Sequence, residues 1–177
     1  MSGMSGSAVG GPPAGGRAAE RLGTTGRVRV RLLRPGGGLV LERRAPNLLV
    51  RSGERLLAKL LLGRSRQALT AVALGSGTAP PAPADVALQQ EVARRQVAEA
   101  DKTIVESGGT VPLLVSVETV FGPGEPAGDV TVAELGLLNA AGELYARAVL
   151  DEPVAKGSAL SLAVRWELHV GGTSDGG

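Results

Sequence analysis

The sequence predicts a mainly β fold: an antiparallel β-sandwich, or an open barrel, that carries one α-helix. Short segments in which apolar and polar residues alternate recur along the chain, as expected of strands with one buried face. Turn signals rich in glycine and proline separate these segments, since the 177 residues include 27 glycines and 11 prolines. Only one segment has the residue spacing of a strongly amphipathic helix.

One folded domain is expected over residues 27–170. The arm that precedes it, residues 1–26, consists largely of small residues without periodicity, so it cannot bury enough apolar surface to offset the entropy of ordering. Residues 171–177 are expected to form a second flexible tail. Cysteine is absent and only three residues are aromatic, so the core of the domain must be built from leucine, valine and alanine.

The domain opens with residues 27–34, in which apolar residues alternate with arginines. This period of two predicts a strand with one buried and one exposed face. Residues 35–38 read Pro-Gly-Gly-Gly and predict a turn, after which residues 39–41 return as the second arm of a hairpin.

A helix is expected near residues 52–63, because leucines recur there at helical spacing. Ser52 or Asn47 is the expected N-terminal cap, and Gly63 is a natural C-terminal stop. The leucines expected on the buried stripe are Leu56, Leu57, Leu60 and Leu61.

Two less regular segments follow the helix. Residues 69–75 predict a short strand, and the prolines of residues 75–85 predict a loop. Residues 86–107 fit either a helix, by their charges, or an edge strand, by the alternation of Val92, Arg94, Gln96 and Ala98; a short helical turn followed by a strand is favoured.

The strand pattern is strongest after residue 110. Residues 129–138 and 143–150 flank an Asn-Ala-Ala-Gly turn at 139–142 and predict a hairpin, and residues 160–170 alternate without a break. An earlier strand is expected to place six side chains on one face: Val111, Leu113, Val115, Val117, Thr119 and Phe121.

Charge is distributed unevenly along the chain. Residues 1–66 hold 13 Lys and Arg against 3 Asp and Glu, whereas residues 67–177 hold 6 against 14. Either this basic region docks on an acidic surface of a partner or of another copy, or the two halves mix their charges on one folded surface. The candidate partner-binding residues are Arg27, Arg29, Arg31, Arg34, Arg43 and Arg44.

The residue types available do not favour an enzyme. Without cysteine the chain has no thiolate chemistry, and the single histidine, His169, cannot by itself build a histidine-based triad or the usual imidazole metal site. Neither a cofactor site nor a metal site is expected, and no apolar run is long enough to cross a membrane. The acidic residues near 91–106 alternate with basic residues, as on a solvated face.

The order of the motifs resembles a family of small bacteriophage tail proteins and tail-fibre or collar N-terminal domains. In that family an Asn-start helix precedes a strand that ends in a Gly-rich loop, and an Asp-x-x-Leu-x-x-Glu stretch, a Glu-x-Gly-Leu hairpin and a Trp-containing strand follow. Val86 and Leu138 depart from the pattern. The matching positions are Asn47, Gly75, Gly77, Thr78, Asp85, Leu88, Glu91, Arg94, Glu134, Gly136, Leu137 and Trp166.

This resemblance implies a non-enzymatic structural subunit of a phage virion or a phage-derived injection particle, in the tail, baseplate or fibre-attachment region. Such a subunit would be made in the host cytoplasm and bind other particle proteins and further copies of itself, as a trimer or hexamer. A capsid decoration (cement) protein is one alternative. A nucleic-acid-binding module is another, which the arginines favour but the scarcity of aromatic platforms disfavours.

Glu134 lies in a mostly apolar predicted strand, where an unpaired carboxylate is costly. It is expected to accept backbone or arginine hydrogen bonds that fix the 75–91 loop, unless it is simply an exposed strand carboxylate. Gly136 suggests a bulge or a close backbone approach. Structural roles are expected for the same set: Gly75, Gly77, Asp85, Glu134, Gly136 and Trp166.

Overall fold

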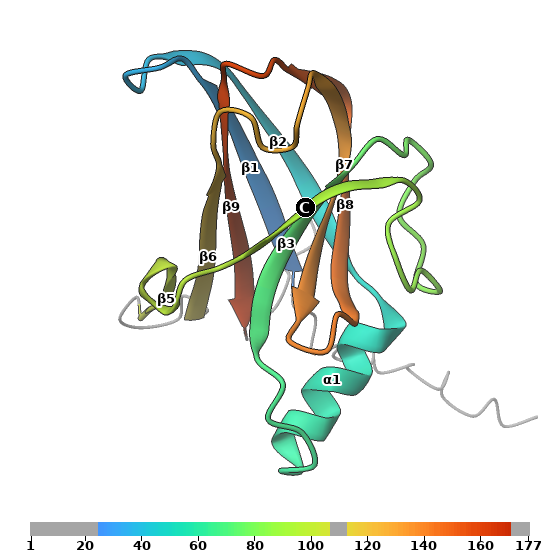
Figure 1. Ribbon diagram of the computed structural model, residues 1–177. Coiled ribbons are helices and arrows are strands. Elements are labelled where there is room, and N and C mark those ends of the chain that lie inside the picture. Colours follow the sequence, from blue (N-terminus) through green and yellow to red (C-terminus); the bar gives the residue numbers. More distant parts are fainter. Residues whose placement is uncertain (1–24, 107–112, 171–177) are drawn as a thin grey trace, which may run out of the picture.

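The computed structural model describes residues 25–106 and 113–170, which form one nine-stranded antiparallel sheet with one α-helix (Figure 1). Nearly all of the expected N-terminal arm and all of the C-terminal tail lie outside the described residues. The elements are β1 Thr25–Leu33, β2 Leu39–Leu49, α1 Arg51–Leu61, β3 Leu69–Gly75, β4 Glu91–Gln96, the 3-10 turn η1 Glu99–Asp101, β5 Lys102–Val105, β6 Leu113–Phe121, β7 Val130–Asn139, β8 Leu144–Lys156 and β9 Ser161–Val170.

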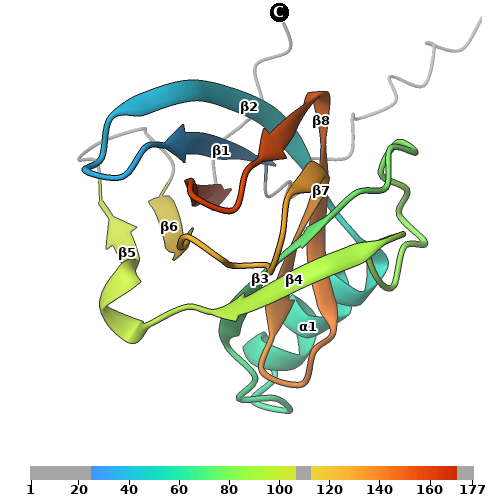
Figure 2. The ribbon, with the colours of Figure 1, turned by 45° about the horizontal axis from the view of Figure 1, so that its top comes forward.

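The strands are ordered β4-β3-β7-β8-β2-β1-β9-β6-β5, and the sheet curls into a half-barrel (Figure 2). Its two edge strands, β4 and β5, are consecutive in the chain and are joined through η1. The mainly β fold with one helix is confirmed. Of the two architectures left open, the single continuous sheet corresponds to an open barrel rather than to two separate stacked sheets.

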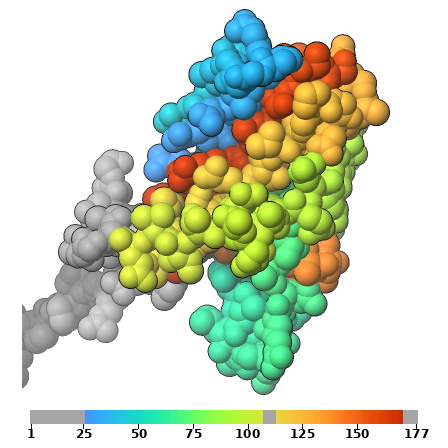
Figure 3. Space-filling model, turned by 60° about the vertical axis from the view of Figure 1, so that its left-hand side comes forward, coloured from blue at the N-terminus to red at the C-terminus, as the bar shows by residue number. Residues whose placement is uncertain are grey.

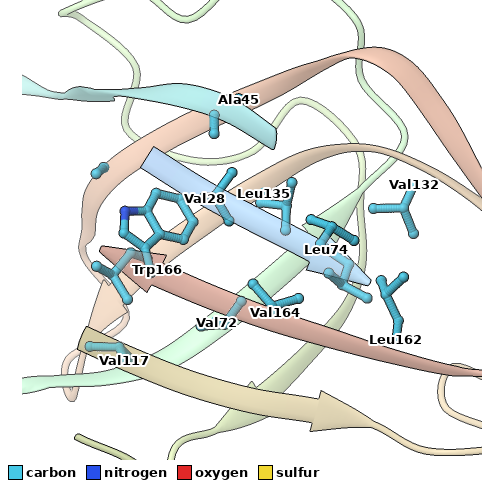
Figure 4. Close-up of a cluster of buried hydrophobic side chains, with 14 of the residues drawn as sticks. Val28, Ala45, Val72, Leu74, Val117, Val132, Leu135, Leu162, Val164 and Trp166 are labelled. Carbon is cyan, nitrogen blue, oxygen red and sulfur yellow. The ribbon is translucent and has the colours of Figure 1, made fainter. Parts of the chain in front are cut away.

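The concave side of the half-barrel holds the main core. Val28, Val30 and Leu32 of β1 are buried there, as their alternation with arginine predicted. Strand β9 contributes Leu162, Val164, Trp166 and Leu168 in the same way. Figure 4 shows Val28 of β1 and Val164 and Trp166 of β9 converging with labelled side chains of β3 and β7. With so few aromatic residues, branched aliphatic side chains fill most of this space.

A second, smaller core covers the opposite face of the sheet at β3, β7 and β8. Ala71 and Ala73 of β3 lie there, while Val72 and Leu74 of the same strand face the main core. Strand β3 is therefore buried on both faces, and its alternation marks two cores rather than a core and a solvent side. The other members of the second core are Val50, Leu88, Leu138 and Leu144.

The N-terminus of helix α1 differs from the prediction, whereas its C-terminus agrees with it. Neither Ser52 nor Asn47 caps it: Val50 occupies the N-cap position without a side-chain hydrogen bond, and Ser52 Oγ donates to the Leu144 carbonyl at 2.6 Å. The Arg51 amide instead donates to the Pro83 carbonyl at 2.8 Å. At the C-terminus Gly63 has φ +64°, and its amide donates to the Leu60 carbonyl, so this predicted stop is confirmed.

Only half of the predicted leucine stripe of α1 is buried. Leu56 is buried and Leu57 partly so, because the first turns of the helix pack against β8. The C-terminal half projects beyond the sheet (Figure 1), which leaves Leu60, Leu61 and Leu62 38%, 87% and 66% exposed. No helix within the described ranges is long and apolar enough to span a membrane.

The segment 86–107 contains two edge strands with a 3-10 turn between them. Strand β4 pairs with β3, and β5 pairs with β6 at the other end of the sheet. The favoured helical turn followed by a strand is present as η1 and β5, and the alternative of an edge strand holds for β4, which precedes them. The segment forms edge strands because β3 and β6 each have a free edge with which it can pair. At an edge, most of its charged side chains stay in solvent.

The remaining predicted strands are present. In β6 the side chains of Val117, Thr119 and Phe121 are buried, Val115 is half-buried and Leu113 is exposed, while Val111 lies outside the described residues. The hairpin of β7 and β8 turns at Asn139, whose Oδ1 accepts the amides of Ala141 and Glu143. This local bonding is typical of an Asx turn.

Replacing Trp166 by alanine is expected to lower the free energy of unfolding by about 3–5 kcal/mol, because the fully buried indole leaves a cavity that the curled sheet cannot close. Urea titration followed by circular dichroism measures this loss. Val120→Ala is the control: Val120 is 48% exposed on the nearby strand β6, so its replacement should cost about 0.5 kcal/mol or less. Equal losses in the two variants would contradict the core placement of Trp166.

Candidate functional site

A buried ion pair joins β7 and β8 on the face of the sheet that carries the second core. Glu134 Oε2 lies 2.8 Å from Arg147 Nη2 and accepts a hydrogen bond from Nε at 2.9 Å. Both side chains are essentially inaccessible to solvent. Both guanidinium nitrogens approach the same carboxylate oxygen, Oε2, so Oε1 is left to other donors.

Glu134 also fixes the backbone of residues 76–90, which connect β3 to β4 and are called here the 76–90 loop. Its Oε1 accepts the amides of Gly77 at 3.1 Å and Gln90 at 2.8 Å, and its Oε2 accepts the Gln89 amide at 3.1 Å. The predicted role of Glu134 is therefore confirmed, and the alternative of an exposed strand carboxylate is wrong. The carboxylate holds both ends of the loop at one point.

Arg147 holds the middle of the same loop. Its Nη1 lies 2.9 Å from Asp85 Oδ2, and its Nη2 donates to the Ala79 carbonyl at 3.1 Å. Asp85 in turn accepts the Ala82 amide at 2.9 Å. Glu134, Arg147 and Asp85 thus form one network, called here the buried ion network. Its hydrogen bonds hold the 76–90 loop against strands β7 and β8.

The surroundings of Glu134 explain the protonation state of its carboxyl group. Burial by itself raises the pKa, but the hydrogen bonds from the Gln90 and Gln89 amides, with the adjacent Arg147, outweigh it and hold the pKa below its ordinary value. Glu134 therefore remains ionised at neutral pH, as the ion pair requires.

Three glycines make room for this network. A Cβ on Gly75 or Gly77 would lie 2.6 Å from Glu134 Oε1, so no side chain fits at either position without a shift of the carboxylate. A Cβ on Gly136 would lie 3.0–3.1 Å from Leu144 and Leu88. The expected close approach at Gly136 is confirmed, because the loop packs directly on the strand.

The fixed loop forms one wall of an open groove of about 640 Å³, called here the proline groove. The loop contributes Thr78, Pro80 and Pro81. The other walls come from β2 (Pro46, Asn47 and Leu48) and from β8 (Val149, Leu150, Asp151 and Pro153). Four prolines in these walls limit both backbone motion and the supply of amide donors.

The groove exists because β2 and β8 separate. Their ladder covers only Asn47–Leu49 against Ala146–Ala148, after which no pairing continues between the two strands. Strand β8 also carries extra residues opposite β7, since Val149 pairs with Glu134 whereas Val154 pairs with Val132. Such a bulge bends the strand away from its neighbour. The groove therefore opens where the ladder between β2 and β8 ends.

The predicted partner-binding arginines lie elsewhere, on β1, β2 and the turn between them. Four of them form ion pairs within the chain: Arg27 with Glu167, Arg29 and Arg44 with Glu42, and Arg43 with Glu152. Arg31 and Arg34 form no ion pair with the part of the chain that the structure describes. Hence the basic and acidic halves of the sequence do mix their charges on this surface, and docking through it stays a prediction.

Sequence reasoning identified Asp85 and Glu134 but missed Arg147. A single arginine in the otherwise apolar segment 144–150 was the available signal, since a charged residue in a buried strand needs a partner. The groove was also missed, because its walls come from three segments whose separation depends on strand pairing. Trp166 lies in the main core, away from the network.

No group of three or more His, Asp or Glu side chains that could hold a metal ion occurs among residues 25–106 and 113–170. His169 is half-buried on β9, where it pairs in register with Thr25 of β1 and Leu114 of β6. Comparisons with protein-family models, with curated proteins and with solved structures found no match for this chain.

Replacing Arg147 by methionine is expected to cost about 3–5 kcal/mol of unfolding free energy, because Glu134 then stays buried without its cation. Amide hydrogen exchange should also accelerate at Gly77, Gln89 and Gln90. Arg94→Met removes the exposed pair with Glu91 and is the matched control, at about 0–1 kcal/mol. Unchanged exchange in the 76–90 loop of the Arg147 variant would show that the network does not hold the loop.

Glu134 should make the fold sensitive to acid. Because the folded-state pKa is depressed, its contribution to stability is present above the unfolded pKa of about 4.3 and is lost as pH falls through the lower folded pKa. The difference in unfolding free energy between the parent and Glu134→Gln should be constant from about pH 7 to 5 and shrink below about pH 4. A difference that does not change with pH would contradict this assignment.

Proposed function

We propose that this chain is a non-enzymatic structural subunit of a bacteriophage virion or a phage-derived injection particle, at the tail, baseplate or fibre-attachment region. In this role the proline groove receives an extended segment of a neighbouring particle protein. The chain is made in the host cytoplasm and acts as a component of the particle.

The observation that carries the proposal is that the buried ion network fixes a wall of the proline groove. Glu134 and Arg147 direct their hydrogen bonds at the 76–90 loop, and that loop is a wall of the proline groove. A wall fixed before binding loses little conformational entropy when a partner docks. The network thus prepares a binding surface, which is the task of an assembly subunit.

The chemistry of the groove indicates what it binds. Its lining is mostly apolar, and it lies where the ladder between β2 and β8 ends. An extended segment can bury apolar side chains against the prolines while its backbone bonds to a strand edge. The order of sequence motifs, which resembles that of phage tail proteins, supports a particle protein as the source of this segment.

Particles assembled without this chain are expected to lack density at the tail, baseplate or fibre attachment in electron micrographs, because a structural subunit leaves a gap. The number of copies per complete particle then separates a tail position, with few copies, from a capsid decoration, with hundreds. Particles without the chain that match complete particles in every part would refute the proposed function.

The groove is tested by Val149→Arg, which places a charge in its apolar wall. This variant should fold yet be depleted from purified particles, because a desolvated charge opposes docking. Thr131→Arg, on an exposed position of the adjacent strand β7, is the matched control and should be incorporated normally. Equal incorporation of the two variants would show that the groove is not the docking site.

A further inference from the structure

The free end of α1 presents an apolar surface ringed by positive charge. Leu60, Leu61 and Leu62, called here the leucine surface, are exposed where the helix projects from the sheet. Arg55, Lys59, Arg64 and Arg66 are exposed on the same helix and the turn after it, and none forms an ion pair with a described residue. Because successive helical positions lie about 100° apart, the three leucines surround the tip of the helix and do not form a single stripe. Exposed leucines gathered at one place are typical of an interaction site.

The edge strand β5 presents the complementary chemistry. Ile104 and Val105, 69% and 43% exposed, lie on this last strand of the sheet. Asp101 precedes the strand and Glu106 follows it, both exposed and without an ion pair to the described part of the chain. These four residues are called here the β5 surface. Ile104 and Val105 point to opposite faces of the sheet, so these two apolar side chains flank the edge strand, with one available carboxylate at each end of it.

The two surfaces cannot satisfy each other within one molecule. In Figure 1 α1 and β5 lie apart at the lower end of the half-barrel, and in Figure 3 the helix (teal) and the segment around β5 (yellow-green) again form separate projections. Two leucine surfaces facing each other would also bring Arg55 and Lys59 of both copies together, which like-charge repulsion opposes. A basic apolar surface and an acidic apolar surface instead fit head to tail.

We propose that the leucine surface of one copy packs on the β5 surface of a second copy, with Arg55 and Lys59 facing Asp101 and Glu106. The contact is heterologous, so its repetition closes a ring if the rotation between copies allows it and otherwise gives an open chain. This inference rests on the proposed function, since it names the copies themselves as one partner of the particle subunit.

Native mass spectrometry and sedimentation velocity over a range of concentration and salt test the contact. The parent should form oligomers that dissociate as salt screens the charges. Leu61→Ser should shift the chain to monomer, whereas Leu39→Ser, 53% exposed on the β1–β2 hairpin, is the control and should not. Circular dichroism verifies that each variant is folded. A parent that is monomeric at every concentration would overturn the inference.

Charge reversal tests which surfaces meet. The variants Arg55→Glu/Lys59→Glu and Asp101→Lys/Glu106→Lys should each lose self-association by at least tenfold in dissociation constant. Mixed together they should associate again, because each reversed surface then faces its opposite charge. Failure of the mixture to associate, or oligomers that survive either reversal, would overturn the proposed contact.

Three further outcomes keep the inference separate from the proposed function. Binding of a monomeric parent to phosphatidylglycerol vesicles, lost on Arg55→Glu/Lys59→Glu, would assign the helix to an anionic lipid surface and overturn the self-contact. A monomeric chain whose absence still removes density from particles would leave the particle role intact while refuting the self-contact. If the chain forms oligomers but its absence changes no particle, the self-contact would stand and the particle role would be refuted.

Discussion

The ion pair between Glu134 and Arg147 constrains much of the structure around it. Removing both charges from water costs several kcal/mol per ion, which only a complete set of hydrogen bonds can offset. The amides of Gly77, Gln89 and Gln90 and the carboxylate of Asp85 supply those bonds, and they all belong to the 76–90 loop. The pair therefore requires the loop to follow one path, and this path requires glycine at Gly75 and Gly77, where a Cβ would collide with Glu134 Oε1.

This requirement extends from the loop to the helix and the second core. The Pro83 carbonyl accepts the Arg51 amide, so the fixed loop also binds the first turn of α1, which no side chain caps. Leu88 of the loop packs with Ala71 and Ala73 on the outer face of β3. Small residues on that face let the loop approach the sheet, so one part of an otherwise half-buried sheet is covered on both sides. The proline groove begins where this cover ends.

Alternation along the sequence predicted β1 and β9 well, because each has one face in the main core and one toward solvent. It was less informative for β3, where both faces are buried, and for residues 86–107, whose pairing depends on which strand edges the rest of the sheet leaves free. Glu134 could be singled out because a carboxylate among apolar residues needs partners. Arg147, which pairs in register with Gly136 two residues from Glu134, carried the same signal, but its link to Asp85 depends on a loop path that no local pattern encodes.

The surface electrostatics follow from which charges the fold leaves unpaired rather than from their order in the sequence. Arg27, Arg29 and Arg44 belong to the basic half of the chain, yet curling of the sheet and hairpin pairing bring carboxylates to them. Exposed pairs of this kind contribute little to stability, but a charge already paired also attracts a partner less. On α1, Arg51 pairs with Glu54, but Arg55 and Lys59 form no ion pair with a described carboxylate, and exposed leucines follow them where the helix extends past the sheet. Attraction and apolar burial therefore coincide at the helix, and this coincidence is why an interface is inferred there rather than at the arginines of the first hairpin.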